Sequence, residues 1–370
     1  MQPFQLERYF ARYEFNVKHL LCASDCESLS LSELLALASP ALLRRWETLR
    51  LGYTESQGDP DLRAAIAATY GTITADDILV AAPEELIFLL MHCFLRPGDE
   101  MIAIAPAYQS LHEVAESLGA VVRRWPVRAV AGQWQLDLDE LAAMLSDRTR
   151  LLVINFPHNP TGYLPSLAEF DAIVALAARH GVPIFCDEMY RGLEHDIADR
   201  LPSICDVYPR GIALSGLSKV HALPGLRIGW LALHDPALLD AMLVLKDYTT
   251  ICNSAPSETL ALIALDAQEQ IVARNLAIIA ANRANAEDLC RRHPALLAWL
   301  PPAAGSVAFP QWRGAVPIDD VCDRLVREEG VLLAPGSLFG AGDGHFRFGL
   351  GRAGFEAGTA IVDAWLARTV

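Results

Sequence analysis

Lys219 occupies a position that is unusual for a lysine. It lies in the segment SGLSKVHALPGLRIG (215–229), between an apolar, strand-like run and a turn marked by proline and glycine, whereas most lysines lie on solvated helix faces. An amine that is held among apolar or cationic groups has a lowered pKa and is therefore a better nucleophile at neutral pH. Arg227 follows eight residues later in the same segment. The segment indicates a reactive amine that is followed closely by a guanidinium.

Three further segments place polar side chains next to or within apolar runs. NFPHNPTG (155–162) ends a buried run, and its Asn-Pro and Thr-Gly dipeptides predict a sharp turn that leaves the Asn159 amide free to donate. CDEMY (186–190) puts an Asp-Glu pair at the end of another run, where a helix cap or a solvated loop is the alternative interpretation. FRFGLGR (346–352) has Arg347 between two phenylalanines in a strand-like run. In open sheets, the loops beyond the strand ends carry the chemistry.

The composition is that of an ordinary globular protein. The chain has 370 residues, 52% hydrophobic and 20% charged, which excludes a disordered protein and allows one large or two ordinary domains. With 30 Lys and Arg against 45 Asp and Glu, the net charge of −15 argues against a nucleic-acid partner. No apolar run is long enough to span a membrane, the start lacks signal-peptide features, and the eight cysteines are scattered. We therefore expect a soluble, cytoplasmic protein with no membrane partner.

The hydrophobic pattern predicts an α/β fold with a mainly parallel sheet. Seven apolar, strand-like runs lie at 77–82, 100–106, 120–125, 150–157, 182–188, 211–216 and 226–233. They alternate with helical patterns at 84–95, 109–119, 137–146, 166–180 and 236–249. Near-continuous apolar strands that are separated by helices are typical of a parallel sheet covered on both faces. A long helical stretch at 256–292 leads into a part that mixes strands and helices, which predicts a second, smaller α+β unit.

No metal site is expected. His19, Cys22 and Cys26 lack a fourth ligand at a zinc-finger spacing, so we interpret them as loop and packing residues. His112 and Glu113 lack the second histidine that a zinc-protease helix carries.

The ordered set of motifs closely resembles the pyridoxal-phosphate (PLP) enzymes of fold type I, and specifically the class I/II aminotransferases. The resemblance covers nearly the whole chain, from LGYTESQG (51–58) to Arg347. It implies a fold-type-I transferase with a large PLP-binding domain at 46–265 and a smaller C-terminal domain at 266–370. The N-terminal segment, 1–45, is expected to contribute to the small domain and to the active site.

The resemblance also implies roles for the residues that match the family's motifs. Lys219 would hold PLP as a Schiff base and then move a proton as general base and acid. Asp187 would pair with the pyridinium nitrogen, which keeps the ring protonated and able to accept electrons. Asn159 and Tyr190 would hydrogen-bond the phenolic oxygen of the ring. Lys219, Asp187 and Tyr190 are thus the expected catalytic residues.

Further cofactor contacts follow from the same resemblance. Ser218 and Arg227 resemble the family's phosphate contacts, because a bidentate guanidinium matches a dianion. Tyr108 matches the aromatic residue that stacks on the cofactor ring. Tyr53 resembles the tyrosine that reaches the phosphate of the neighbouring subunit's cofactor, which implies a homodimer with a two-fold interface.

Substrate binding is expected at Arg347, which resembles the arginine that clamps the substrate α-carboxylate, and at Asn159. Arg352 is expected on the solvated surface. The chain departs from the family pattern at AAPEE (81–85), where members usually carry Gly-Ala or Ser-Gly-Thr, and Glu84 at the start of the helix that follows is expected among the cofactor contacts. Pro83 offers no N–H to a phosphate, although the start of this predicted helix still favours an anion.

The leading hypothesis is an aminotransferase that moves an amino group from an amino acid to a 2-oxo acid through a Lys219 Schiff base. The alternative is a PLP-dependent lyase or cyclase of the capreomycidine-synthase kind, which uses the same residues and then expels a β or γ leaving group. A non-catalytic PLP-binding regulator is a third class, against which the net charge of −15 argues. The sequence does not identify the amino donor, the acceptor or the role of residues 19–26.

Overall fold

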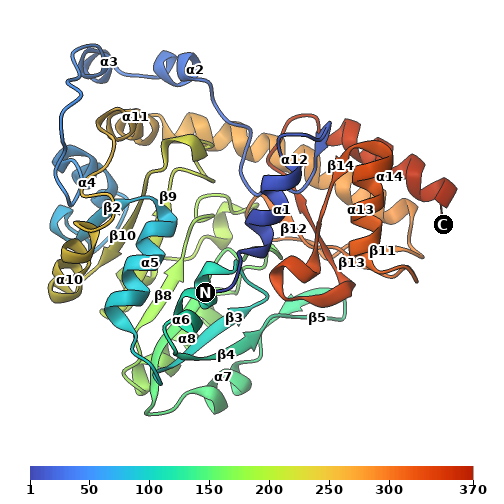
Figure 1. The fold of residues 1–370 in the computed structure, drawn as a ribbon, viewed down its shortest axis with the longest axis horizontal. Coiled ribbons are helices and arrows are strands. Elements are labelled where there is room, and N and C mark those ends of the chain that lie inside the picture. The colour runs from blue at the N-terminus through green and yellow to red at the C-terminus, as the bar shows by residue number, and fades with distance from the viewer. Residues whose placement is uncertain (370) are drawn as a thin grey trace.

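A seven-stranded sheet forms the centre of the computed structural model, which describes residues 1–369 (Figure 1). The strand order is β2-β10-β9-β8-β7-β3-β4. The strands are Ile78–Ala81 (β2), Glu100–Ala105 (β3), Val121–Pro126 (β4), Thr149–Asn155 (β7), Ile184–Asp187 (β8), Gly211–Gly216 (β9) and Gly229–Leu233 (β10). All neighbours are parallel except that β10 is antiparallel to both β9 and β2. The predicted α/β fold with a mainly parallel sheet is confirmed.

Helices cover both faces of the sheet, because successive side chains of a strand point to opposite faces. Ile78 and Val80 of β2 belong to one apolar cluster, whereas Leu79 and Ala81 belong to another. The first cluster includes side chains from α4 (Pro60–Ala67), α7 (Leu138–Met144), α8 (Leu167–Arg179), α9 (Ile204–Val207) and α11 (Ala255–Asp266). The second includes side chains from α5 (Pro83–Phe94), α6 (Ser110–Ser117), α10 (Pro236–Lys246) and α12 (Gln268–Arg292). Burial on both faces explains the nearly continuous apolar strands.

The C-terminal part mixes short strands and helices, and α12 leads from the main sheet into it (Figure 1). Its elements are β11 (Leu297–Ala298), β12 (Val307–Ala308), β13 (Gln311–Trp312), α13 (Ile318–Glu329), β14 (Val331–Leu332), β15 (Ala334–Pro335), β16 (Phe346–Gly349) and α14 (Phe355–Thr369). Strand β16 lies between β12 and β15, antiparallel to both. This arrangement carries Arg347 on the central strand of a small sheet.

The N-terminal segment lies against two different parts of the molecule. Helix α1 (Gln5–Tyr13) leads to β1 (His19–Leu20), which pairs in parallel with β14 in the C-terminal part. The chain then crosses to the helices of the main sheet, where α2 (Leu31–Ala36) and α3 (Pro40–Glu47) pack near α11 (Figure 1). The remaining elements are a hairpin of β5 (Arg128–Val130) and β6 (Gln133–Gln135), and short 3₁₀ helices at Ala75–Asp77, Ile197–Asp199, Pro224–Leu226, Gly336–Phe339 and Gly342–Gly344.

Two predicted elements differ in detail from the structure. The helical stretch at 256–292 is two helices, α11 and α12, because Ala267 leaves the helical conformation between them. The strand predicted at 226–233 begins only at Gly229, because Pro224 starts a 3₁₀ turn and Arg227 takes a left-handed conformation with a φ of 55°. Among the described helices, none combines the length and the apolar character that crossing a membrane requires.

Candidate active site

A cavity of about 480 Å³ lies beyond the carboxyl ends of β7, β8 and β9, where an open α/β sheet ordinarily binds its ligand. Eight of the sequence-predicted site residues line it, namely Glu84, Tyr108, Asn159, Asp187, Tyr190, Ser218, Lys219 and Arg227. The opposite wall consists of side chains from α1 and of residues 23–25. A second cavity, of about 580 Å³, lies next to α12 and is lined by none of these eight side chains.

The sheet wall is built at the ends of two adjacent strands. Asp187 is the last residue of β8, with 8% of its surface exposed, and its Oδ1 accepts a hydrogen bond from the Met189 N–H at 3.0 Å. Burial raises the pKa of Asp187 to about 6, although the Met189 N–H and the nearby Lys219 act in the opposite direction. Asn155, at the end of β7, donates to the Asp187 carbonyl at 2.8 Å and accepts from the Asn159 N–H at 2.7 Å. The Asn155 amide therefore fixes the two loops relative to each other.

Lys219 follows β9 by three residues, and its amine points to the N-terminal segment. The side chain is half-buried, the loss of water around its amine lowers its pKa, and Asp25 acts in the opposite direction. Its Nζ donates to Ser24 Oγ at 2.8 Å. The carbonyl of Ser24 accepts in turn from the Tyr190 hydroxyl at 3.3 Å and from Ser306 Oγ at 2.7 Å. Lys219 and Tyr190 are thus both hydrogen-bonded to Ser24, which was not among the site residues predicted from the sequence.

Arg347 reaches the cavity region from the C-terminal part. The side chain is fully buried, and its Nη1 donates to Asn159 Oδ1 at 3.1 Å. Its Nε and Nη2 both donate to the Cys22 carbonyl, at 3.1 and 2.8 Å. The guanidinium carbon also lies 5.9 Å from the centroid of the Phe10 ring. These contacts hold the guanidinium beside Asn159 and beside α1.

The start of α5 and the loop before β10 form the anion-favouring end of the cavity. Helix α5 begins at Pro83, so its free N–H groups start at Glu84. Glu84 is half-buried, the loss of water around its carboxyl raises its pKa to about 7, and it accepts from Ser110 Oγ at 3.3 Å. Arg227 lines the same cavity, and its Nη1 donates to the Pro224 carbonyl at 3.0 Å. Its left-handed backbone, rare for an arginine, marks a constrained turn.

Tyr108 and Tyr53, which were both predicted to contact the cofactor, lie in very different places. Tyr108 lines the cavity, with its hydroxyl donating to Glu7 Oε1 at 2.7 Å and its ring centroid 4.8 Å from that of Phe4. Tyr53 is 92% exposed and does not line the cavity of its own chain. The contact of Tyr53 with the phosphate of a neighbouring subunit's cofactor stays a prediction.

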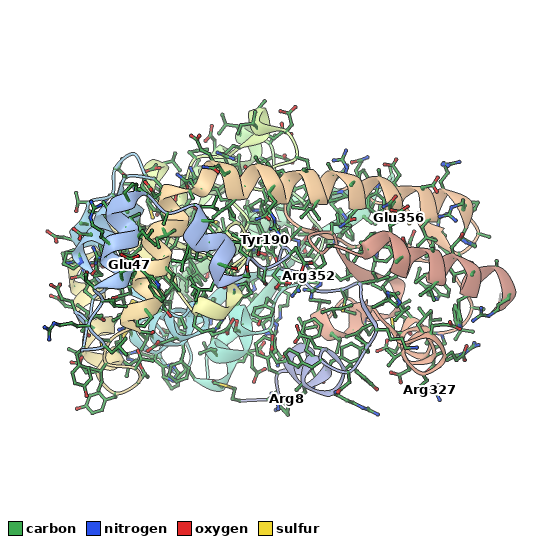
Figure 2. All side chains as sticks on the ribbon, turned by 90° about the horizontal axis from the view of Figure 1, so that it is seen from above. Arg8, Glu47, Tyr190, Arg327, Arg352 and Glu356 are labelled. Atoms are coloured by element: carbon green, nitrogen blue, oxygen red, sulfur yellow. The ribbon has the colours of Figure 1, made fainter. Side chains whose placement is uncertain are left out.

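The expectation that Arg352 lies on the solvated surface is wrong. Its Nε and Nη2 donate to the two oxygens of Asp25 at 3.0 and 2.7 Å, and Asp25 is buried. Figure 2 shows Arg352 and Tyr190 near the middle of the molecule, and the neighbouring residues Asp25 and Ser24 contact them, respectively. Because Arg352 and Asp25 are 327 positions apart in the chain, local sequence gave no signal for their pairing.

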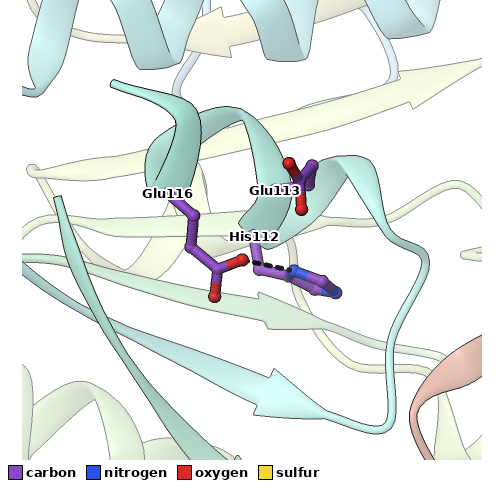
Figure 3. Close-up of side chains that lie close together, drawn as sticks. All are labelled: His112, Glu113 and Glu116. Carbon is purple, nitrogen blue, oxygen red and sulfur yellow. Dashed lines mark ion pairs between the residues drawn. The ribbon is translucent and has the colours of Figure 1, made fainter. Parts of the chain in front are cut away.

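A separate cluster of metal-ligating side chains lies on α6. His112, Glu113 and Glu116 have ligand atoms within 4.8 Å of one another (Figure 3). Glu116 accepts from Arg124 at 2.6 Å, and its other oxygen lies 3.7 Å from His112 Nδ1. Glu113 accepts from the Gln2 N–H. Both carboxylates are therefore engaged by donors of the chain itself.

The comparisons with known proteins agree with this arrangement. The sequence pattern of the family "Aminotransferase class I and II" matches residues 20–357. Capreomycidine synthase of Streptomyces vinaceus is 32% identical over 362 residues, which are 96% of this chain and 92% of that protein. The structure of a PLP-dependent aminotransferase from Streptococcus suis has a TM-score of 0.93 and 30% identity, covering 100% of this chain and 98% of that one. The PLP-dependent cyclase OrfR has a TM-score of 0.92 and 28% identity, with the same coverage.

The donor set of the cavity fits pyridoxal phosphate. The cofactor needs an amine for its aldehyde, an anion for its ring nitrogen and cationic or N–H donors for its phosphate. Lys219, the buried Asp187, Arg227 and the start of α5 supply these types from one cavity. Sequence, fold and cavity chemistry together place this chain in the class I and II aminotransferase family of fold-type-I enzymes, which use pyridoxal phosphate.

Proposed function

We propose that this protein is an aminotransferase that moves an amino group from an amino acid to a 2-oxo acid, with Lys219 as its catalytic amine. The observation that carries the proposal is the convergence of Lys219, Asp187, Asn159 and Arg347 from separate segments on one cavity region. Pyridoxal phosphate supplies an electron sink that stabilises negative charge on the substrate's α-carbon. The chain must bind the cofactor, orient the substrate and move one proton.

Asp187 would hold the protonated ring nitrogen of the cofactor. An ion pair favours the charged forms of both partners, so it would counteract the burial that raises the pKa of Asp187. The side-chain amide of Asn159 and the hydroxyl of Tyr190 would donate to the phenolic oxygen of the ring. Asn159 is suited to this role, because its Oδ1 already accepts from Arg347 and its amide nitrogen has no other hydrogen bond among residues 1–369.

The phosphate would be held at the other end of the cavity by Ser218, Arg227 and the first N–H groups of α5, at Glu84 and beyond. The ring of Tyr108 would cover the cofactor from the side of α1. With Pro83 at the first position of α5, the chain offers one backbone donor fewer than a helix without proline would.

Arg347 would bind the α-carboxylate of the substrate, since a buried planar guanidinium is complementary to a carboxylate. A fixed carboxylate orients the bond between the α-carbon and its hydrogen toward the catalytic base. Lys219 Nζ would take that proton and return it to the cofactor carbon that receives the amino group. Because burial lowers the pKa of Lys219, a larger fraction of its amine is neutral and able to take the proton.

We also propose that the enzyme works as a homodimer, with Tyr53 contacting the phosphate bound by the partner subunit. Leu51, Tyr53 and Tyr248 are between 83% and 92% exposed, although large apolar side chains prefer burial. Their two loops are joined, because Thr54 Oγ1 donates to the Asn253 carbonyl at 3.2 Å. The three exposed side chains thus belong to two loops that contact each other. A fully active monomer in analytical ultracentrifugation would contradict this proposal.

A single-turnover experiment without any 2-oxo acid tests the proposed reaction. An aminotransferase releases one equivalent of oxo acid from an amino acid and stops with its cofactor as pyridoxamine phosphate. Absorbance spectra and quantification of the released oxo acid measure both products. Repeated turnovers without an acceptor would contradict transamination.

Elimination or cyclisation is the second candidate, and the similarity to a capreomycidine synthase and to a PLP-dependent cyclase favours it. Such a reaction uses the same proton abstraction by Lys219 and needs, in addition, a leaving group on the substrate's β or γ carbon. Repeated turnovers in the single-turnover experiment, with a substrate that carries a leaving group, would support this candidate.

A further inference from the structure

The cavity has an excess of negative charge. Two cationic side chains line it, Lys219 and Arg227, whereas five carboxylates do so, namely Glu7, Glu14, Asp25, Glu84 and Asp187. Arg347 and Arg352 add a third and a fourth cation just behind the lining, so the carboxylates outnumber the cations by one. Anionic groups near a bound substrate repel one another and favour a cationic ligand.

Three of the five carboxylates have evident partners or roles. Asp25 is paired with both donors of Arg352. Glu84 is half-buried at the start of α5, and its pKa is raised to about 7, so a large part of it is uncharged at neutral pH. Asp187 faces the place that we propose for the cofactor ring. Glu7 and Glu14 remain without a cation, and among residues 1–369 no Lys, Arg or His lies within ion-pair distance of either.

Glu7 lies on α1, and Glu14 directly follows the last residue of α1 in a helical conformation; both line the cavity, with Phe10 between them in the chain. Residues three, four and seven positions apart share one side of a helix. Glu7 accepts from the Tyr108 hydroxyl, whereas the half-buried Glu14 has no hydrogen bond from any described residue. Phe10 provides an apolar surface between the two carboxylates.

Observations that do not involve these two carboxylates show that the cavity receives a ligand. Lys219 is half-buried, lines the cavity and has no carboxylate within 4 Å among residues 1–369. Asp187 is 8% exposed, and of its two oxygens only Oδ1 has a hydrogen bond within the described chain. A charged group that is shielded from water without an oppositely charged partner destabilises the folded protein, and a bound ligand can supply that partner.

The position of Arg347 indicates how a bound substrate is oriented in the cavity. Its guanidinium carbon lies 5.9 Å from the centroid of the Phe10 ring, so a carboxylate bound by Arg347 is adjacent to the middle of α1. We place the substrate's side chain along Phe10, because Glu7 and Glu14 line the cavity next to it. An apolar stem with a charged end matches this surface, because the stem packs on the ring and the end meets a carboxylate.

We infer that the amino-acid substrate carries a second cationic group, a guanidinium or ammonium at the end of its side chain, which Glu14 binds directly and Glu7 attracts. This inference rests on the proposed function, since it concerns the donor of the same site. A neutral or acidic side chain would leave the two carboxylates without a cation and is therefore discriminated against.

A binding experiment tests the inference without requiring turnover. The PLP-loaded protein is titrated calorimetrically with 5-guanidinopentanoate and with the uncharged 5-ureidopentanoate, neither of which has an amino group that reacts with the cofactor. We expect the cationic compound to bind about 10- to 100-fold more tightly, the range for a hydrogen bond to a charged group. Equal affinities, or no binding by the cationic compound, would overturn the inference.

Variants that remove the charge of Glu7 or Glu14 show which of the two carboxylates causes the preference for the cationic compound. Glu14→Gln should lose most of the preference, Glu7→Gln a smaller part, and the double variant all of it. Glutamine at position 7 can still accept from Tyr108, so the change removes charge rather than the hydrogen bond. Glu47→Gln is the matched control, because Glu47 is exposed on α3, away from Tyr190 and Arg352 in Figure 2. A double variant that keeps the preference would refute the assignment.

An amino-donor panel separates this inference from the proposed function. If arginine or lysine converts PLP to pyridoxamine phosphate with a higher kcat/KM than citrulline, norleucine and glutamate, both stand. If neutral or acidic donors are converted at least as well, the inference fails and the aminotransferase proposal stands. If no donor is converted while the cationic analogue still binds more tightly, the proposed function fails and the charge preference stands.

Discussion

The two walls of the cavity are built in different ways. The sheet wall is formed by the ends of β7, β8 and β9, and its polar groups are fixed by backbone contacts such as those of Asn155 and Asp187. The opposite wall, α1 and residues 23–25, is attached through a two-residue strand pair, through the hydrogen bond from Tyr9 to the Leu333 carbonyl and through the ion pair of Asp25 with Arg352.

This difference separates two tasks. The residues that we propose to hold the cofactor lie mostly on the sheet wall, where any shift would disturb a buried seven-stranded sheet. The carboxylates that we propose to select the substrate lie on α1, whose packing can change without disturbing the strand pairing of that sheet. A family with one cofactor and many substrates is expected to vary the second wall more freely than the first.

Breaking the sheet wall at Asp187 should have the largest effect among the variants considered. Asp187→Asn removes the anion proposed for the ring nitrogen, and the loss of one preorganised electrostatic group costs about 10²- to 10³-fold in kcat. Cofactor affinity should also fall in the unmodified protein as the pH drops through about 6, because protonation discharges Asp187. Titration with PLP from pH 5 to 7.5 measures this, and the variant should lack that part of the pH dependence. Unchanged activity in the variant would contradict the proposed role.

Arg347 contacts both walls, and we propose that it binds the substrate's carboxylate. Its variants should therefore weaken the binding of the substrate rather than that of the cofactor. Arg347→Met should raise KM for amino donors about 10- to 100-fold, since a charged hydrogen-bonding partner of the carboxylate is lost. Arg347→Lys should recover part of this, because it keeps the charge but not the planar fork. PLP affinity, measured in the same preparations, should change little. A variant that loses PLP but keeps KM would place Arg347 on the cofactor instead.

Removing the ion pair between Asp25 and Arg352 tests how strongly the opposite wall, α1 and residues 23–25, is attached to the rest of the protein. Asp25→Asn leaves a mostly buried guanidinium without its carboxylate, and we expect the free energy of unfolding to fall by about 2–3 kcal/mol. Activity should fall about tenfold, because the neighbouring Ser24 contacts Lys219. Asp288→Asn, which removes an exposed partner of Arg291 and Arg292, is the control and should leave stability nearly unchanged. Equal effects of the two variants would contradict a structural role for residue 25.

Ser24 should produce the smallest effect. Ser24→Ala removes the hydrogen bond from Lys219 Nζ, and a single hydrogen bond corresponds to about a threefold to tenfold change in kcat. A positioning role also predicts a shift in the pH at which the absorbance of the Lys219-bound cofactor changes, whereas a purely structural role does not. Ser24→Thr keeps the hydroxyl and should restore the unmodified titration.

The sheet wall could be predicted from the sequence because its signals are local. Apolar runs end in Asn-Pro-Thr-Gly, Asp-Glu and Ser-Lys motifs, and parallel strands bring their ends to one edge whatever the loops between them do. The structure places Asn159, Asp187 and Lys219 together for this reason. The mainly parallel sheet was predicted on the same basis.

The N-terminal wall could not be predicted in this way. Glu7, Glu14 and Ser24 reach the cavity because β1 pairs with β14 and Asp25 pairs with Arg352, both more than 300 positions later in the chain. A two-residue strand has no period that a sequence pattern can show. The acidic face of α1 was visible as Glu7 and Glu14 seven positions apart, but such spacing is as typical of a solvated helix face as of a cavity wall.

The most direct test of the account is to locate the lysine that binds the cofactor. The protein is loaded with PLP, reduced with borohydride, digested and analysed by mass spectrometry. The account predicts a phosphopyridoxyl group on the peptide that contains Lys219, and no such adduct in Lys219→Ala. A reduced adduct on Lys246, which is fully buried, or one that persists in Lys219→Ala would contradict it.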